Sequence, residues 1–344
     1  MTHTDVLVVG QGLAGSALAW RLIEAGREVV VVDRGNAGKL SASQLAVGLI
    51  TPITGKRLTL DPQWLSMRLA AEKFYRRVER VTAATLFESR PAYRLFTSAA
   101  EQAEYAKRRQ DAAYAEQTAP LPRGDLPASI CCDRGGLAMP TAARLNVAAF
   151  LDATRDWLKR RDAYRQATIA SPQELQIEPQ GVTWPQQELR AGSVVFCEGF
   201  TRESAARLPN LRPAKGELLR VRVPGLGLTR VLHRDLWIAP LLTGEQDEYW
   251  IGASYDWNPA DDQPTDAARQ QLTGKLRVVC DLPVEILDHQ AAIRPATVDR
   301  QPMVELSAEQ PRIASLNGLG SRGAIYGPWY AQHLVKQLFT VRPD

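Results

Sequence analysis

Three glycines near the N-terminus have the spacing of a phosphate-binding turn. Residues 10–15 read Gly-Gln-Gly-Leu-Ala-Gly, and Asp33 follows at about the distance at which an acid binds a ribose. The glycines allow a tight turn and a close approach of a pyrophosphate, which the N–H groups and dipole of the next helix would hold. These residues therefore predict a dinucleotide site. The predicted contacts in the turn are Gly10, Gly12, Leu13, Ala14 and Gly15.

The residues around this turn predict the elements that position it. Residues 5–9 and 28–32 are short apolar runs typical of buried parallel strands, and residues 13–25 have the apolar spacing of a helix. Together they form a βαβ unit with a right-handed crossover. The motif alone does not separate NAD from FAD. Asp33 disfavours a 2′-phosphate, whereas the adjacent Arg34 would favour one.

A second glycine-rich segment lies near the C-terminus. Residues 318–323 read Gly-Leu-Gly-Ser-Arg-Gly, and too few residues follow to complete another βαβ unit. Glycines ahead of a helix can bring N–H groups and a positive dipole to a flavin ring, which gains negative charge when reduced. A helix cap followed by a turn is the alternative.

Further patterns predict the rest of the architecture. Helices are predicted near residues 62–81, 99–113, 146–160 and 329–339, and buried strands at 193–197 and 312–316. Runs at 218–223, 236–242 and 248–254 predict an antiparallel sheet, and Pro-Leu-Pro at 120–122 predicts a boundary region. The order indicates an α/β nucleotide domain in three pieces with a second domain inserted between them.

Composition excludes several classes of protein. The 344 residues carry 42 basic and 38 acidic side chains, so a net charge of +4 does not indicate a nucleic-acid partner. The basic clusters at 107–109 and 159–161 are interpreted as solvated helix faces. No apolar run reaches the roughly 20 residues of a membrane span, and no signal peptide is evident, so a cytoplasmic location is expected. The four cysteines and four histidines show no metal-site spacing, and the cysteines are expected to be reduced.

Several segments resemble the D-amino-acid oxidase superfamily, which includes glycine oxidase, sarcosine oxidase and the flavin domain of a bifunctional tRNA-modifying enzyme. They are the first βαβ unit and residues 43–48, 194–199, 215–219, 238–240, 251–253 and 293–297. The resemblance covers nearly the whole chain. It implies an α/β fold: a Rossmann-type FAD-binding domain with an inserted, mostly antiparallel α+β substrate domain. The expected FAD-binding pieces are 1–58, 136–205 and 288–344, and the expected substrate pieces are 59–135 and 206–287.

The resemblance also implies where FAD binds, with adenosine at Asp33 and the flavin ring near Gly48 and residues 320–324. The further cofactor contacts that it implies are Arg34, Ser43, Val47, Gly199, Gly320, Ser321, Arg322, Gly323 and Ala324. Sarcosine oxidases carry a cysteine that is covalently linked to the flavin. No cysteine follows Pro295 in this chain, so noncovalent FAD is expected.

Three residues are catalytic candidates on the same basis. Arg294 matches the family arginine that binds a substrate carboxylate, for which a planar guanidinium is well suited, and a structural ion pair is the alternative. Arg322 matches a position near the flavin, where it would bind substrate or stabilise the reduced ring. Trp237 occupies a position that is often Tyr in relatives, so Tyr255 is a candidate replacement. His289, shortly before Arg294, is expected at the surface or in the core.

The leading hypothesis is an FAD-dependent oxidoreductase that oxidises a C–N bond of a small amine or amino acid by hydride transfer to flavin N5. Two alternatives remain: a flavin-dependent modification of a tRNA nucleoside, and a flavin-binding redox protein or subunit without amine turnover of its own. A nicotinamide dehydrogenase would leave residues 318–323 unexplained. The electron acceptor is open between oxygen and another compound.

Overall fold

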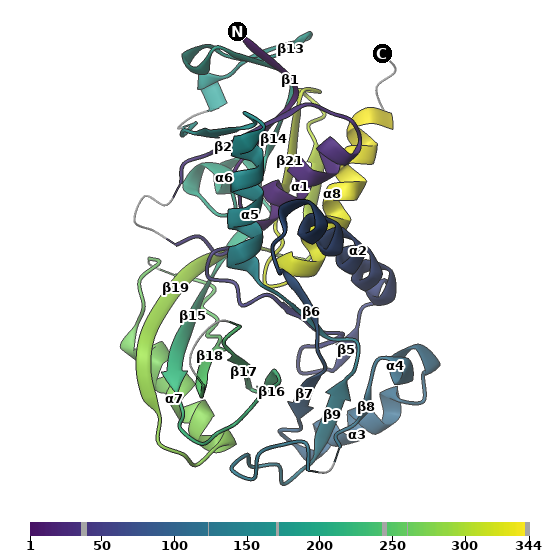
Figure 1. Ribbon diagram of the computed structural model, residues 1–344, viewed down its shortest axis with the longest axis vertical. Coiled ribbons are helices and arrows are strands. Elements are labelled where there is room, and N and C mark those ends of the chain that lie inside the picture. Colours follow the sequence, from purple (N-terminus) through teal and green to yellow (C-terminus); the bar gives the residue numbers. More distant parts are fainter. Residues whose placement is uncertain (36–39, 123, 170–171, 243–245, 260, 341–344) are drawn as a thin grey trace.

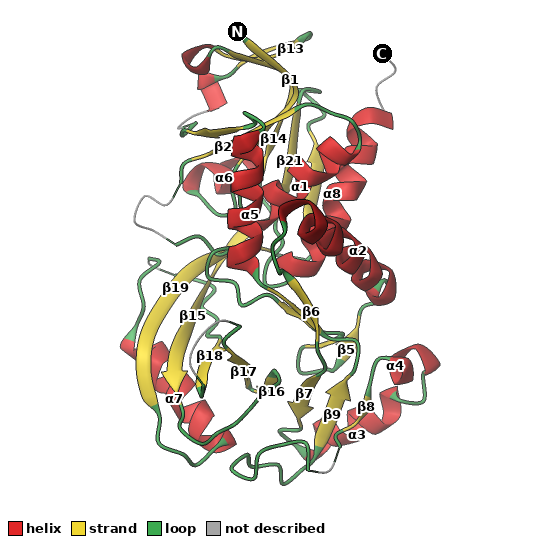
Figure 2. Cartoon of the chain, in the orientation of Figure 1, coloured by secondary structure: helices red, strands yellow, loops and turns green. Residues whose placement is uncertain are grey.

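The computed structural model describes residues 1–35, 40–122, 124–169, 172–242, 246–259 and 261–340. Its upper part in Figure 1 is a sheet covered by helices, and it holds both β1 and α8, the first and last described elements. Its lower part is mostly strand, with helices only at the periphery (Figure 2). Among the described residues, no helix has the length and apolar character needed to cross a membrane.

The upper sheet is built on five parallel strands in the order β11, β2, β1, β14 and β21. Their bounds are β1 (Thr2–Val9), β2 (Val29–Asp33), β11 (Tyr164–Gln166), β14 (Leu189–Phe196) and β21 (Ile313–Asn317). Three antiparallel strands extend it, namely β12 (Gln176–Glu178), β13 (Gly181–Trp184) and β20 (Met303–Leu306). The central strands are rich in valine because both faces are buried. The predicted βαβ unit is therefore present.

The helices of the upper part are packed around this sheet (Figure 1). They are α1 (Leu13–Glu24), α2 (Trp64–Thr82), α5 (Val147–Arg160), α6 (Arg202–Arg207) and α8 (Gly323–Thr340). Helix α8 lies against α1 because Gly323 carries no Cβ, which would be 2.8 Å from the Leu13 side chain. Helix α2 packs on α8 within the same core.

Helix α8 begins at Gly323, whereas the sequence predicted a start near Trp329. The difference arises at Pro328, which lies inside the helix. Proline has no N–H, so the Ala324 carbonyl lacks its usual helical hydrogen bond. The Tyr75 hydroxyl from α2 donates to that Ala324 carbonyl at 2.7 Å. A side chain from a distant helix thus replaces the missing hydrogen bond and lets the helix start earlier.

The lower part is a sheet of eight strands in the order β19, β15, β18, β17, β16, β7, β9 and β8. Their bounds are β7 (Ala92–Leu95), β8 (Ala119–Pro120), β9 (Gly136–Met139), β15 (Leu211–Arg222), β16 (Leu232–Arg234), β17 (Leu236–Pro240), β18 (Glu248–Gly252) and β19 (Glu285–Thr297). All neighbours are antiparallel except β16 and β7. Helix α7 (Asp266–Val279) packs on one face.

Shorter elements complete the chain. They are β3 (Leu49–Ile50), β4 (Ile53–Thr54), β5 (Thr59–Leu60), β6 (Phe87–Ser89), β10 (Ala143–Leu145), and two 3₁₀ turns at Pro172–Glu174 and Pro185–Gln187. The predicted helix over 99–113 is divided into α3 (Ala99–Arg108) and α4 (Ala112–Glu116), because the Asp111 carboxylate accepts from Tyr114 N–H and caps a new helix. Pro120 of the predicted connector lies in β8.

The predicted residue limits of the two domains stay a prediction. Those limits assign α2 to the substrate domain, and α2 packs in the core of the upper part. They assign most of β19 to the FAD-binding domain, and β19 pairs with β15 in the lower sheet. The two parts are therefore joined by long elements as well as by loops.

Candidate active site

One long cavity runs between the upper and lower parts of the molecule. It begins beside Asp33, passes the glycine turn and ends at Arg294 on β19. The predicted residues that line it are Gly10, Gly12, Leu13, Ala14, Asp33, Arg34, Ser43, Val47, Gly48, Gly199, Gly320, Ser321, Gly323, Ala324 and Arg294. Gly15, Tyr255 and Arg322 are outside this lining.

The glycine turn needs glycine because other backbone segments pack directly against it. Gly10 has φ +101°, and a Cβ there would lie 2.5 Å from the Cys197 carbonyl oxygen. A Cβ on Gly15 would lie 1.8 Å from the Gly10 carbonyl oxygen. Gly15 therefore contributes by letting α1 approach β1, although it does not reach the cavity.

The N-terminus of α1 is open toward the cavity. Its N-cap, Gly12, has no side chain to accept a backbone N–H, and no acidic residue lies in the first turn. Leu13 N–H donates to Ser43 Oγ at 3.1 Å, which fixes the neighbouring segment. The remaining first-turn N–H groups have no partner within the helix. They can donate to phosphate oxygens, helped by the helix dipole.

Asp33 is oriented at the other end of the cavity by main-chain donors. Its Oδ2 accepts from Gln11 N–H at 2.7 Å, and its Oδ1 accepts from Gly35 N–H at 2.7 Å. Each carboxylate oxygen keeps a second lone pair for a ribose hydroxyl. Arg155 from α5 donates to the Gln11 side chain at 2.9 Å and also lines the cavity.

The C-terminal glycine segment is tied to the strand that carries Arg294. Gly320 N–H donates to the Pro295 carbonyl at 2.9 Å, and the Asn317 amide donates to the Gly199 carbonyl at 2.8 Å. Helix α8 then starts at Gly323, beside the start of α1. Two helix N-termini thus meet at one cavity, an arrangement suited to phosphates at one and a reduced flavin ring at the other.

Cys197 lies at the floor of the cavity. Burial raises the pKa of its thiol, so the group stays protonated and unreactive. In the part of the chain that the structure describes, all four cysteines are free and no cluster of ligands could hold a metal ion.

The Arg294 guanidinium contacts no counter-charge among the described residues. Its guanidinium lies at the cavity, with Nη1 3.5 Å from the Ser254 carbonyl oxygen and Cζ 4.5 Å from the centre of the Tyr255 ring. It forms no ion pair with any described residue. Burial lowers its pKa, because desolvation disfavours the charge. The alternative interpretation, a structural ion pair, therefore has no carboxylate partner in the described chain.

Gly216 makes room for this guanidinium. A Cβ on Gly216 would lie 1.9 Å from Nη2 and 2.1 Å from Cζ of Arg294. Sequence reasoning did not include Gly216 among the site residues. The signal that could have found it is an isolated glycine just before the predicted strand at 218–223, since a glycine in a strand often marks a close approach.

Trp237, and not Tyr255, lines the cavity. The Trp237 indole covers Gly252, whose absent Cβ would lie 2.8 Å from the ring. Tyr255 is 50% exposed, and its ring lies between Arg294 and Trp257. Leu218, Ala292 and Asp262 also line this end and were not predicted.

Arg322 is directed elsewhere. Its Nη1 donates to Asp61 at 3.3 Å and to the Tyr326 hydroxyl at 2.6 Å. Its side chain does not line the cavity, which differs from the predicted contact with substrate or flavin. The position of Arg322 in the sequence suggested that it lies near the flavin, but its bond to Asp61 directs the side chain away from the cavity. His289 likewise binds Glu217, at 2.9 Å, and is not a lining residue.

The fold and cavity together are those of a dinucleotide-binding α/β protein with a second, mostly antiparallel sheet. The chain belongs to the DAO family, described as FAD dependent oxidoreductase, whose model matches residues 5–337. It is thus an FAD-dependent enzyme. The resemblance and the predicted fold class are confirmed.

Known proteins of two kinds are similar to the chain. The tRNA 5-methylaminomethyl-2-thiouridine biosynthesis bifunctional protein MnmC of Caulobacter vibrioides is 28% identical over 97% of this chain and 54% of its own. The chain thus spans about half the length of such relatives. Glycine oxidase from Geobacillus kaustophilus superposes with a TM-score of 0.82 at 18% identity, covering 100% of this chain and 96% of that one. Iminodiacetate oxidase from Chelativorans sp. BNC1 gives 0.77 at 18% identity, covering 99% and 96%.

Proposed function

We propose that this enzyme oxidises a C–N bond of a small amine or amino acid whose carboxylate is bound by Arg294. The observation that carries the proposal is the Arg294 guanidinium, which lines the FAD cavity without an ion pair to any described residue. Arg294 is half-buried, so its charge is partly removed from water without a counter-charge, and a substrate carboxylate would offset that cost. A bidentate pair would also fix the substrate's orientation.

The residues at the two ends of the cavity support different parts of this reaction. The α1 N-terminus and Asp33 are suited to the phosphates and ribose of FAD, and the 320–324 turn to its ring. Bound FAD supplies the acceptor for the hydride of the substrate C–H bond. Arg294 then has a positioning task, holding the reacting carbon in place.

The walls around Arg294 support exclusion of water. Leu218, Trp237 and Ala292 line the cavity there and are apolar apart from the indole N–H, while Asp262 adds one carboxylate to the same end. A low-dielectric wall strengthens the attraction between guanidinium and carboxylate. The oxidised product is an imine, whose hydrolysis to a carbonyl compound and an amine needs one water molecule.

The test is reduction of the bound flavin by a panel of amino acids and N-substituted amino acids under anaerobic conditions. We expect Arg294→Ala to lower the rate at subsaturating substrate by about 100-fold while retaining FAD. The matched control is Arg220→Ala, an exposed arginine of the same sheet paired with Glu248. Equal reduction of wild type and Arg294→Ala by every carboxylate-bearing amine would reject the proposal.

A second candidate function follows from the MnmC relatives, whose name concerns tRNA. It is flavin-dependent modification of a tRNA nucleoside. Binding of unmodified tRNA with an affinity that falls steeply with salt would support it. If the flavin is tightly bound but is reduced by no amine and by no tRNA, a redox protein or subunit without amine turnover of its own would instead be favoured. A cytoplasmic location stays a prediction.

Noncovalent attachment of FAD is part of the proposal. Of the four cysteines, none follows Pro295, and the one that lines the cavity, Cys197, is a buried thiol with a raised pKa. Acid precipitation of the purified protein should release the yellow cofactor into the supernatant with the mass of FAD. Flavin that remains in the pellet would contradict noncovalent binding.

A further inference from the structure

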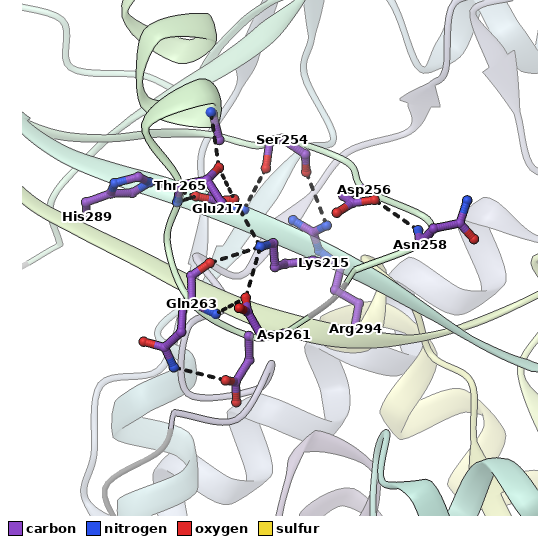
Figure 3. A network of polar contacts seen from close by, with 12 residues as sticks. Lys215, Glu217, Ser254, Asp256, Asn258, Asp261, Gln263, Thr265, His289 and Arg294 are labelled. Carbon is purple, nitrogen blue, oxygen red and sulfur yellow. Dashed lines mark hydrogen bonds and ion pairs between the residues drawn. The ribbon is translucent and has the colours of Figure 1, made fainter.

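The carboxylate end of the cavity is backed by a buried ion pair on β15. Lys215 and Glu217 are 4% and 2% exposed, and by strand alternation they face away from Gly216 and Leu218, which line the cavity. Lys215 Nζ lies 3.6 Å from Glu217 Oε1. Such a pair needs further hydrogen bonds to offset its desolvation. Figure 3 shows where these bonds go.

Both charges bind the segment that connects β18 to α7, in its described stretches 254–259 and 261–265. Lys215 Nζ donates to the Gln263 carbonyl at 2.9 Å and lies 3.6 Å from Asp261 Oδ1. Glu217 accepts from Thr265 N–H at 2.7 Å and from the Thr265 hydroxyl at 2.9 Å. These contacts hold the C-terminal end of the segment.

The main chain of the same two residues holds the N-terminal end. Lys215 exchanges hydrogen bonds with Asp256, N–H to carbonyl, at 2.8 and 3.0 Å. Glu217 N–H donates to Ser254 Oγ at 3.0 Å, and Ser254 N–H donates to the Glu217 carbonyl at 3.2 Å. The segment is therefore fixed to β15 at both ends by Lys215 and Glu217.

This segment supplies the surroundings of Arg294. The Ser254 carbonyl oxygen lies 3.5 Å from its Nη1, and the Tyr255 ring lies 4.5 Å from its Cζ. Figure 3 shows the contact between Arg294 and Ser254. A shift of the segment would remove both contacts and free the guanidinium to rotate.

We infer that Lys215 and Glu217 are positioning residues that hold this β18–α7 segment against Arg294 and so preorganise the carboxylate site. This inference rests on the proposed role of Arg294. Neither side chain touches the cavity. Their effect is therefore expected on carboxylate binding, with little effect on FAD.

The test measures acetate, the smallest carboxylate probe, by calorimetry on the FAD-loaded protein. Lys215→Met keeps the aliphatic stem and removes the donors. We expect it to raise the acetate Kd about tenfold or more and to speed backbone hydrogen exchange at residues 254–259 and 261–265, with FAD content unchanged. The matched control is Lys275→Met on α7, whose Nζ donates to the Asp235 carbonyl at 3.3 Å.

A second variant covers the case in which Lys215→Met does not fold. The double variant Lys215→Met/Glu217→Gln removes both buried charges, and the Asp261 carboxylate that loses its partner is exposed to water. It should fold, keep FAD and show the same weakened acetate binding, because the contacts to Gln263 and Asp261 are gone.

The outcomes separate the inference from the proposed function. An acetate Kd within twofold of wild type in a folded Lys215 variant, with exchange unchanged and with weakened binding in Arg294→Ala, overturns the inference alone. Acetate binding that is equal in wild type and Arg294→Ala overturns the proposed function and the inference with it.

Discussion

The two ends of the cavity are built in different ways. At the cofactor end, the turn and Asp33 lie within one βαβ unit, and Gln11 N–H bonds directly to Asp33. At the other end, proposed above to bind the substrate and so called the substrate end, Gly216, Ser254 and Arg294 come from segments far apart in the chain and meet through the pairing of β15 with β18 and β19. The cofactor end is therefore specified locally, and the substrate end depends on strand register.

The close contacts at the two ends also differ in kind. Cβ atoms on Gly10 or Gly15 would meet carbonyl oxygens of the backbone, which cannot move without disturbing the sheet. A Cβ on Gly216 would meet the far end of the Arg294 side chain. Substitutions at the first end should thus affect folding and FAD, and those at the second should affect substrate alone.

The largest effect is expected for Gly15→Ala. Its Cβ would lie 1.8 Å from the Gly10 carbonyl oxygen, so α1 must move off β1. We expect a loss of about 3 kcal/mol of stability, together with loss of bound FAD, measured by denaturant unfolding and flavin absorbance. The control is Gly274→Ala in α7, where a Cβ meets nothing within 4 Å and helix propensity should improve. Normal flavin content in Gly15→Ala would refute the local account of the cofactor end.

Gly216→Ala should break the other end selectively. The added methyl displaces the Arg294 guanidinium, and we expect KM for a carboxylate-bearing substrate to rise about 100-fold, with FAD affinity within twofold of wild type. Steady-state kinetics and flavin titration measure the two quantities. Loss of FAD in step with loss of substrate binding would show that the ends are not separable.

Glu101→Gln tests the stability of the lower part with pH. The Glu101 carboxylate links α3 to β7. It accepts hydrogen bonds from the Thr97 N–H and hydroxyl at 2.8 and 2.9 Å, and it forms an ion pair with Arg94 of β7. Burial raises its pKa, but the hydrogen bonds from Thr97 and the Arg94 charge outweigh burial and hold it below 4.5. A lowered pKa adds stability above the unfolded-state value that is lost as the pH falls through the folded-state value.

We therefore expect wild type to lose stability as the pH falls below about 4.5, and Glu101→Gln to be weaker by about 2 kcal/mol at pH 7 and less dependent on acid. Urea unfolding at a series of pH values measures both. Glu104→Gln on the same helix, which breaks a surface pair with Arg108, should change stability by less than about 1 kcal/mol. Parallel pH profiles for wild type and Glu101→Gln would contradict this assignment.

The smallest effect is expected for Asp33→Asn. An amide has one acceptor oxygen, so it cannot accept from both Gln11 and Gly35 N–H and still bind a ribose. FAD affinity should fall about tenfold, with kcat on saturated enzyme unchanged. Asp5→Asn, which accepts Glu28 N–H on the adjoining strand, is the matched control. Unaltered FAD affinity in Asp33→Asn would remove the ribose role.

What could be predicted from the sequence also differs between the cofactor end and the substrate end. The turn and its strands were predicted because glycine spacing and valine runs act over short distances, whereas the other predicted lining residues came from the family resemblance. Arg294 was predicted only through family resemblance, and its partner Gly216 was missed. Arg322 was expected at the flavin, but Asp61, which no local pattern connects to it, binds its guanidinium. The start of α8 was predicted too late because Tyr75 satisfies the carbonyl that Pro328 leaves open.

By itself, the sequence determined the dinucleotide turn and the acid that follows it, since backbone sterics and helix dipoles depend on neighbouring residues. Only the tertiary structure decided which arginine reaches the cavity, which aromatic ring lines it, and that Lys215 and Glu217 support the segment beside it. The physical reason is that side-chain direction depends on register and on partners contributed by distant strands. A charge such as Arg294 is left unpaired by the fold as a whole, and no local pattern records that.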